Sequence, residues 1–255
     1  MGGDLMTVHF VGAGPGAADL LTLRAAGLLA RADVVLYPGT YLDEEVLGHC
    51  SPDTRLVDTQ HLDLDQIMRH LVDADRDGLD VVRLVSGDPS VYSALAEQTR
   101  RLDEAGVAWQ VTPGVPAYAA AAARVGRELT VPLVAQSIVL TRAQARSTAM
   151  PETEALRHFA RTRATLVIHL AITRIREVMS ELGADYGDDC PVVVVFRASQ
   201  PGEVVLRGTV ADIVEQVEQA GLRQAAVIMV GRALDPRGGG DSYLYDPARD
   251  RSTTA

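Results

Sequence analysis

Three short runs of apolar, β-branched residues each end directly in a cluster of glycine and proline. The clusters are residues 12–17, 87–89 and 113–116, and the segments between them alternate between strand-like and helical spacing of apolar residues. Such a strand-helix-strand order favours a mostly parallel sheet covered by helices. Ligands of these sheets bind beyond the carboxyl ends of the strands. We therefore expect the three loops to lie along one edge of one sheet.

The first 117 residues predict one α/β domain with a mostly parallel sheet. The expected strands are 7–11, 34–37, 81–85 and 108–111, and the expected helices are 18–29, 64–74 and 91–102.

The following residues, 118–235, predict a second α/β domain with a mixed sheet. A helix is expected at 117–125, and strands at 138–140, 166–168, 192–196, 204–206 and 225–230. The short connection at 199–202 between two of these strands favours an antiparallel hairpin. Residues 236–255, with three consecutive glycines at 238–240, predict a flexible tail.

Every basic residue of the chain is an arginine. The 24 arginines stand against 34 acidic residues, which gives a net charge of -10. The absence of lysine excludes Schiff-base enzymes, pyridoxal phosphate enzymes and the lysine-containing phosphate loop. The acidic balance argues against nucleic-acid binding, which needs clustered positive charge. An anionic small molecule is still allowed where arginines are grouped locally.

Several patterns bear on location and on metals. No apolar stretch approaches the roughly 18 residues that span a bilayer, and the first residues lack the pattern of a secretory signal. Cys50 and Cys190 have no CxxC companion, which is typical of free cytosolic thiols, and His61 and His70 are too far apart for a local metal pair. We expect a cytoplasmic protein without a membrane segment or a metal site.

The first loop, with the sequence GAGPGA at 12–17, fits the loose dinucleotide fingerprint G-x-G-x-x-A. A nicotinamide cofactor would also need an acidic residue at the end of the second strand, whereas Asp33 precedes that strand. Pro15 removes one backbone donor that a pyrophosphate would use. A tight turn from strand to helix explains the same residues without any ligand, so both interpretations stay open.

The second loop also has a structural and a functional interpretation. Gly87 permits close approach of a ligand, while Pro89 suits the first turn of the helix expected at 91–102, with Asp88 or Ser90 as its cap. His169 ends an apolar strand, where it is either a general base or a buried core histidine.

Taken together, these motifs resemble the tetrapyrrole methyltransferase family. The resemblance lies in the ordered set VGAGPG at 11–16, DLLT at 19–22, SGDPSVY at 86–92 and TPGV at 112–115, and it covers roughly residues 7–234. It implies two α/β domains, a methyl donor bound in the cleft between them, and transfer of a methyl group from S-adenosylmethionine.

Within that family, LTRAQAR at 140–146 followed by MPE at 150–152 resembles the members that methylate precorrin-4 at C11 in cobalamin biosynthesis. The turn YPGT at 37–40 and the tail SYLYD at 242–246 resemble theirs with substitutions. Sister enzymes that methylate C20, C17 or uroporphyrinogen III share the loops and remain alternatives, as do a nicotinamide-dependent oxidoreductase and a non-catalytic nucleotide-binding module.

The resemblance also implies which residues form the site. Those expected to bind the donor are Pro15, Gly87, Asp88, Val91, Pro116, Ala117, Leu170, Ala198 and Ala226. Those expected to contact the tetrapyrrole are Gly14, Gly16, Tyr92, Arg142 and Arg146. An arginine close to a substrate carboxylate near a protein surface has a Coulomb attraction of about 4 kcal/mol before desolvation. No residue is assigned as general base, and the resemblance implies a homodimer.

Overall fold

The computed structural model describes residues 7–39, 42–143, 149–235, 237, 239–245 and 248–249. Its contacts divide the chain into two compact units. Unit 1 comprises Met1–Ala120 together with Arg197–Gly202, and unit 2 comprises Ala121–Phe196 together with Glu203–Ala255. No local sequence pattern predicts that residues 197–202 belong with the N-terminal unit. The predicted tail at 236–255 lies partly outside the described residues.

Unit 1 contains a five-stranded parallel sheet in the order β3-β2-β4-β1-β5. Its strands are β1 (Val8–Gly12), β2 (Val34–Tyr37), β3 (Arg55–Asp58), β4 (Val81–Val85) and β5 (Trp109–Thr112). The predicted parallel sheet is confirmed. The sequence does not predict β3, because this edge strand has only two apolar residues between two charged ones and is largely exposed.

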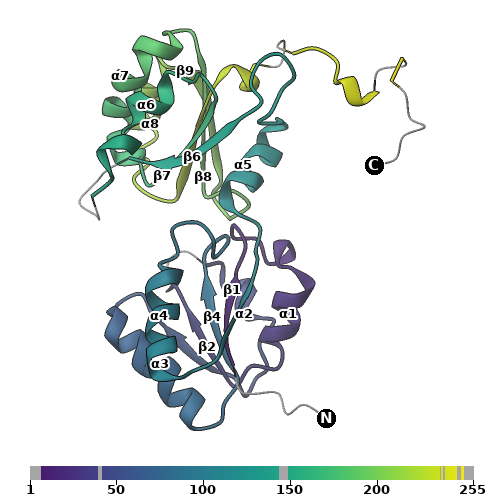
Figure 1. Cartoon of the computed structure of the whole chain (residues 1–255), viewed down its shortest axis with the longest axis vertical. Helices are drawn as coiled ribbons and strands as arrows, with labels where there is room; N and C mark the ends of the chain where they lie inside the picture. The colour runs from purple at the N-terminus through teal and green to yellow at the C-terminus, as the bar shows by residue number, and fades with distance from the viewer. Residues whose placement is uncertain are drawn as a thin grey trace. The chain divides into compact units, whose positions relative to one another are not determined.

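Helices cover both faces of this sheet (Figure 1). They are α1 (Leu23–Leu29), α2 (Glu44–Leu47), α3 (Leu64–Arg76) and α4 (Leu95–Ala105). Helix α5 (Ala117–Val125) follows β5, and its residues from Ala121 onward belong to unit 2. On one face, Leu28 and Leu29 of α1 pack with the sheet in one core. On the other, Leu71 of α3 and Leu102 of α4 pack with Phe10 of β1 in a second core.

Two predicted helices begin later than the sequence suggests. The segment expected at 18–29 is a 3-10 turn (Ala18–Leu20) followed by α1, whose N-cap Thr22 accepts a hydrogen bond from Ala25 N at 3.1 Å. The helix expected at 91–102 begins only at Leu95, because Tyr92 and Ala94 have φ angles of 54° and 56°. Left-handed residues interrupt a right-handed helix.

Unit 2 contains a mixed five-stranded sheet in the order β6-β7-β10-β8-β9. Its strands are β6 (Ile138–Arg142), β7 (Thr165–His169), β8 (Pro191–Phe196), β9 (Val204–Thr209) and β10 (Ala226–Val230). Strands β6 and β7 are parallel, whereas β10 runs antiparallel to both of its neighbours. Strands β8 and β9 form the predicted antiparallel hairpin.

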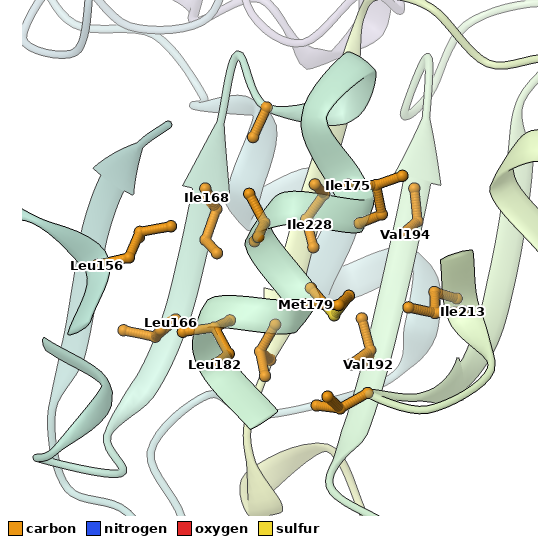
Figure 2. Packing of buried hydrophobic residues seen from close by; sticks show 14 of the residues in the cluster. Leu156, Leu166, Ile168, Ile175, Met179, Leu182, Val192, Val194, Ile213 and Ile228 are labelled. Atoms are coloured by element: carbon orange, nitrogen blue, oxygen red, sulfur yellow. The ribbon is translucent and has the colours of Figure 1, made fainter. Parts of the chain in front are cut away.

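Three helices cover one face of this second sheet: α6 (Leu156–Ala160), α7 (Ile175–Tyr186) and α8 (Ile213–Gln219). Figure 2 shows Met179 and Leu182 of α7 packed against Ile168 and Ile228 of the sheet, with Ile213 of α8 beside Val192 and Val194, all of which are buried. The segment that follows α5 contacts β7, because Thr165 Oγ1 of that strand donates to the Leu129 carbonyl at 2.7 Å. No helix in the described part of the chain has the length and apolar character needed to cross a membrane.

Candidate active site

The three glycine- and proline-rich loops of unit 1 meet at one edge of the sheet, as predicted. They follow β1, β4 and β5, which are adjacent and parallel. A Cβ atom added to Gly12 would lie 2.5 Å from Gly114 N and 2.7 Å from the Gly87 carbonyl oxygen, and one added to Gly114 would overlap that same oxygen. Only glycine allows this approach, so the three loops form one closely packed structure.

Asp88 ties two of these loops together. Its Oδ2 accepts a hydrogen bond from Gly114 N at 2.8 Å, and its Oδ1 accepts from Ser90 N at 2.9 Å and from the Ser90 hydroxyl. Partial burial raises the pKa of Asp88, but these hydrogen bonds lower it, and the net pKa lies below its ordinary value of 3.8. Helix α4 has Ala94 as its N-cap, without a side-chain cap. The prediction that Asp88 or Ser90 caps this helix is therefore wrong.

The hydrogen bonds of the first loop argue against pyrophosphate binding there. Ala13 N donates to the Val85 carbonyl at 2.8 Å, Gly14 N to the Gly87 carbonyl at 3.1 Å, and Ala17 N to Ser199 Oγ at 3.2 Å. Pro15 has no N–H to offer. Asp33 lies at the opposite edge of the sheet, where its Oδ2 accepts from Asp80 N. Three backbone donors of the loop are therefore already used, and a fourth position has none to offer to a dinucleotide.

The connection between β8 and β9 covers the first loop within unit 1. Gln200 Nε2 donates to the Pro15 carbonyl at 2.7 Å, and a Cβ on Gly16 would overlap the Gln200 side chain. Gly14 and Gly16 are both buried. Contact of these two glycines with a substrate would therefore require Gln200 to move. The sequence gives no local signal for this contact, because the two segments are 185 residues apart.

Several predicted donor-binding residues of unit 1 lie together. A Cβ on Gly87 would have the Ala117 N at 3.7 Å and the Pro116 Cα at 3.8 Å as its nearest neighbours, so there is room above Gly87. Val91 and Tyr92 follow in the same segment, and the Tyr92 side chain is exposed. This edge can receive a ligand that approaches the backbone closely.

The predicted residues of unit 2 also share one edge of their sheet. Ala226 begins β10 and pairs with Phe196, after which β8 ends and the buried Ala198 follows in unit 1. Leu170 directly follows β7, has a φ of 53° and is 62% exposed. A large apolar side chain held outward at a strand end is available to cover a flat ligand.

A cavity of about 830 Å³ lies in unit 2 beside the end of β6. Its charged lining residues are Arg142, Arg157, Arg174, Glu152, Glu154, Glu177 and Glu181. Arg157 is paired with Glu152, and Arg174 with Glu177. Arg142 thus lines a cavity in which carboxylates outnumber arginines, whereas Arg146, the second predicted substrate anchor, lies outside the described residues.

His169 lies beside Arg142 across the β6–β7 pair. Burial lowers the pKa of His169 below its ordinary value of 6.5. As pH falls below 6.5, the unfolded chain takes up this proton before the folded protein does, and stability is lost. We expect the free energy of unfolding of the wild type to fall more steeply between pH 7 and pH 5 than that of His169→Asn. Parallel curves in chemical denaturation would contradict this.

Arg83 is a buried cation within the sheet of unit 1. It is 8% exposed in β4, where Nε donates to Gln98 Oε1 at 3.3 Å and Nη1 donates to Thr59 Oγ1 at 3.3 Å and to the Leu84 carbonyl at 3.0 Å. Burial lowers the pKa of Arg83 to about 10. That shift corresponds to a cost of about 3 kcal/mol for burying the charge. The sequence signal for this buried cation is an arginine in the middle of the otherwise apolar strand sequence VVRLV.

Comparison with known proteins identifies the family of this chain. Residues 7–214 match the family model of the tetrapyrrole (corrin/porphyrin) methylases. The chain belongs to this family. Among other methylases, the precorrin-4 C(11)-methyltransferase of Rhodococcus erythropolis is 56% identical over 248 residues, which cover 97% of this chain and 100% of that protein.

Solved structures of related methylases have the same fold. The X-ray structure of a cobalt precorrin-4 methyltransferase, described as a cobalamin biosynthetic enzyme, matches with a TM-score of 0.89 at 38% identity, covering 92% of this chain and 99% of that one. A uroporphyrin-III C-methyltransferase from Thermus thermophilus, complexed with S-adenyl homocysteine, matches with a TM-score of 0.74 at 31% identity, covering 89% and 93%. The predicted two-sheet α/β architecture and the family resemblance are confirmed.

Proposed function

We propose that this protein is an S-adenosylmethionine-dependent methyltransferase that methylates precorrin-4, or cobalt-precorrin-4, at C11 in cobalamin biosynthesis. The observation that carries the proposal is the full-length similarity to a precorrin-4 C(11)-methyltransferase at 56% identity. The larger TM-score to a cobalt precorrin-4 methyltransferase than to a uroporphyrin-III enzyme favours C11 over the sister reactions. The packed loops of unit 1 support a site for a ligand that meets the backbone closely.

In this proposal the residues that bind the donor are those expected from the family resemblance. They are Pro15, Gly87, Asp88, Val91, Pro116, Ala117, Leu170, Ala198 and Ala226. The room above Gly87 supports the fit, since a side chain there would take the space of the ligand. The anionic Asp88 suits the cationic sulfonium or amino group of the donor.

The donor supplies an electrophilic methyl group on a sulfonium, and an electron-rich ring carbon of the substrate accepts it. Such a displacement needs little acid or base chemistry from the protein, so the chain's contribution is positioning. Holding two reactants in line can lower a barrier by about 7–11 kcal/mol. The fixed geometry of the three loops serves this purpose, because a packed backbone cannot shift when the ligand binds.

The tetrapyrrole carries several carboxylates and meets a protein of net charge -10. We propose that Arg142 and Arg146 bind two of these carboxylates and that Tyr92 contacts the macrocycle. In this proposal Gly14 and Gly16 also contact the macrocycle, after the Gln200 side chain has moved away from them. The glutamates around the cavity in unit 2 oppose an anionic ligand, so Arg142 must act at the rim of that cavity rather than inside it.

The direct test is methyl transfer by the purified protein from labelled donor to metal-free precorrin-4, to cobalt-precorrin-4 and to uroporphyrinogen III. We expect one of the two precorrin-4 forms to be methylated, with the new methyl at C11 by NMR. Methylation of uroporphyrinogen III alone would assign the protein to a sister reaction. Binding of adenosylhomocysteine without NAD(H) binding separates this function from an oxidoreductase, and turnover separates it from a binding module.

Replacing both proposed substrate arginines tests whether the tetrapyrrole and the methyl donor are bound by different residues. We expect Arg142→Ala with Arg146→Ala to raise the KM for the tetrapyrrole about tenfold or more, because a hydrogen bond to a charged group contributes about 1.5–3 kcal/mol when enclosed. The affinity for adenosylhomocysteine should stay within about twofold of wild type, since other residues bind it. Arg176→Ala, which breaks a surface ion pair with Glu218, is the matched control. An unchanged KM for the tetrapyrrole would mean that neither arginine binds the substrate.

We also propose a cytoplasmic homodimer. Ile138 and Leu140 on the edge strand β6 are exposed apolar residues, which favours a further protein surface over them. The free thiols of Cys50 and Cys190 suit a reducing compartment. Light scattering should give twice the chain mass of 27.2 kDa, and a value near that mass at micromolar concentration would rule the dimer out.

A further inference from the structure

One nitrogen of the Arg83 guanidinium, Nη2, has no hydrogen-bond partner among the described residues. Its Nε and Nη1 groups donate to Gln98, Thr59 and Leu84, all of them neutral acceptors. Its Nη2 group makes no hydrogen bond or ion pair with any described residue, and it is not among the atoms that are fully buried without a partner. The Nη2 end of a guanidinium that is otherwise buried therefore reaches the surface.

Arg83 lies toward the carboxyl-end edge of the sheet, the edge at which the three loops also lie. Arg83 is two residues before the end of β4, and its partner Thr59 directly follows β3. Its other partner, the buried Gln98 of α4, donates from Nε2 to the carbonyl of Ala94 at 3.2 Å. Arg83 is thus linked through Gln98 to the left-handed segment that contains Tyr92.

A purely structural role does not account for the charge. The carbonyl and side-chain oxygens around Arg83 are neutral, and a neutral amide could also bridge two such groups. No carboxylate is among the groups that shift the pKa of Arg83, for which burial is the only cause. A buried cation without a counter-ion lowers stability, whereas an anionic ligand would compensate it. The Nη2 group by itself has two N–H groups that it can donate to a carboxylate.

We propose that Arg83 binds a carboxylate of a bound ligand through its Nη2 end, at the loop edge of unit 1. The identity of that ligand rests on the proposed function. Two carboxylate-bearing ligands are then available: the acid side chains of the tetrapyrrole, and the amino-acid portion of the methyl donor. Both present the same chemistry to Arg83, and binding measurements distinguish them.

The experiment compares wild type with Arg83→Gln, Arg83→Lys and the control Arg101→Gln, which removes a partly exposed arginine of α4 paired with Asp65. Calorimetry measures adenosylhomocysteine and methylthioadenosine, which lacks the amino-acid carboxylate. Equilibrium titration measures the tetrapyrrole, so that no measurement depends on turnover. Thermal unfolding of each variant reports stability.

We expect Arg83→Gln to weaken one carboxylate ligand about 10- to 100-fold. If the donor is that ligand, adenosylhomocysteine binding falls and methylthioadenosine binding does not. If the tetrapyrrole is that ligand, its binding falls and both adenosine compounds bind as to wild type. Arg83→Lys keeps the positive charge without the Nη2 group and should lose less affinity. If Arg83→Gln does not fold, Arg83→Lys is the variant on which the test is made. Arg101→Gln should match wild type throughout.

The stability measurement separates binding from scaffolding. We expect the melting temperature of Arg83→Gln to equal or exceed that of the wild type, because an uncompensated buried charge has been removed. Unchanged affinity for all three ligands would overturn the proposal, with or without a lower melting temperature. A wild type that binds these ligands but transfers no methyl group would contradict the proposed function. A loss of affinity in Arg83→Gln would then still support the role of Arg83.

Discussion

Gly114→Ala is expected to destabilise unit 1 by about 3 kcal/mol and to abolish donor binding. The added Cβ would overlap the Gly87 carbonyl oxygen and lie 2.8 Å from the Gly12 Cα. Every one of these neighbours is backbone, so no flexible side chain can give way. The three loops would have to separate, and the strands beneath them are too closely paired to follow without loss of hydrogen bonds.

The chain provides its own reporter and its own control for this variant. Trp109, the single tryptophan, lies in β5 just before Gly114, so its fluorescence follows the unfolding of unit 1 in urea. Gly27→Ala, on the exposed side of α1, should be neutral or stabilising by up to about 1 kcal/mol, because only Arg31 Nη1 lies within 4 Å of its Cβ. A Gly114→Ala protein with the midpoint and adenosylhomocysteine affinity of wild type would contradict the packing of the loops.

Asp88→Ala is expected to lower donor affinity about 10- to 100-fold. The substitution removes the acceptor for Gly114 N and for both donors of Ser90, and a hydrogen bond to a charged group is worth about 1.5–3 kcal/mol. The second and third loops would lose the side-chain link that Asp88 makes between them. Calorimetry with adenosylhomocysteine measures the loss directly.

Asp88→Asn separates the link between the loops from the effect of charge. The amide keeps an acceptor oxygen in the same position but carries no negative charge, so the loss should be smaller than for alanine. If the charge of Asp88 also favours the sulfonium, Asp88→Asn should weaken S-adenosylmethionine more than adenosylhomocysteine. Equal losses for both compounds would limit Asp88 to holding the loops, and wild-type affinity in the alanine variant would exclude both roles.

The sequence by itself determined the parts of this protein that depend on short-range patterns. β-branched runs followed by glycine and proline predict β1, β4 and β5 and the loops after them, and parallel strands bring those loops to one edge. The short Ser-Gln-Pro-Gly connection predicts the β8–β9 hairpin. In each case the residues that specify the structure are close together along the chain.

Only the tertiary structure decided the rest, because the groups that matter are far apart in the sequence. Ser199 and Gln200 reach the first loop across more than 180 residues. Ser199 accepts from Ala17 N, a backbone donor that a dinucleotide would need, and Gln200 donates to the Pro15 carbonyl. Arginine is a residue type that usually lies on the surface. Arg83 is buried only because the tertiary structure brings Thr59 and Gln98 next to it, where they accept its hydrogen bonds. Helix α4 begins at Leu95 rather than Val91 because the folded loop holds Tyr92 and Ala94 in left-handed conformations that no local propensity favours.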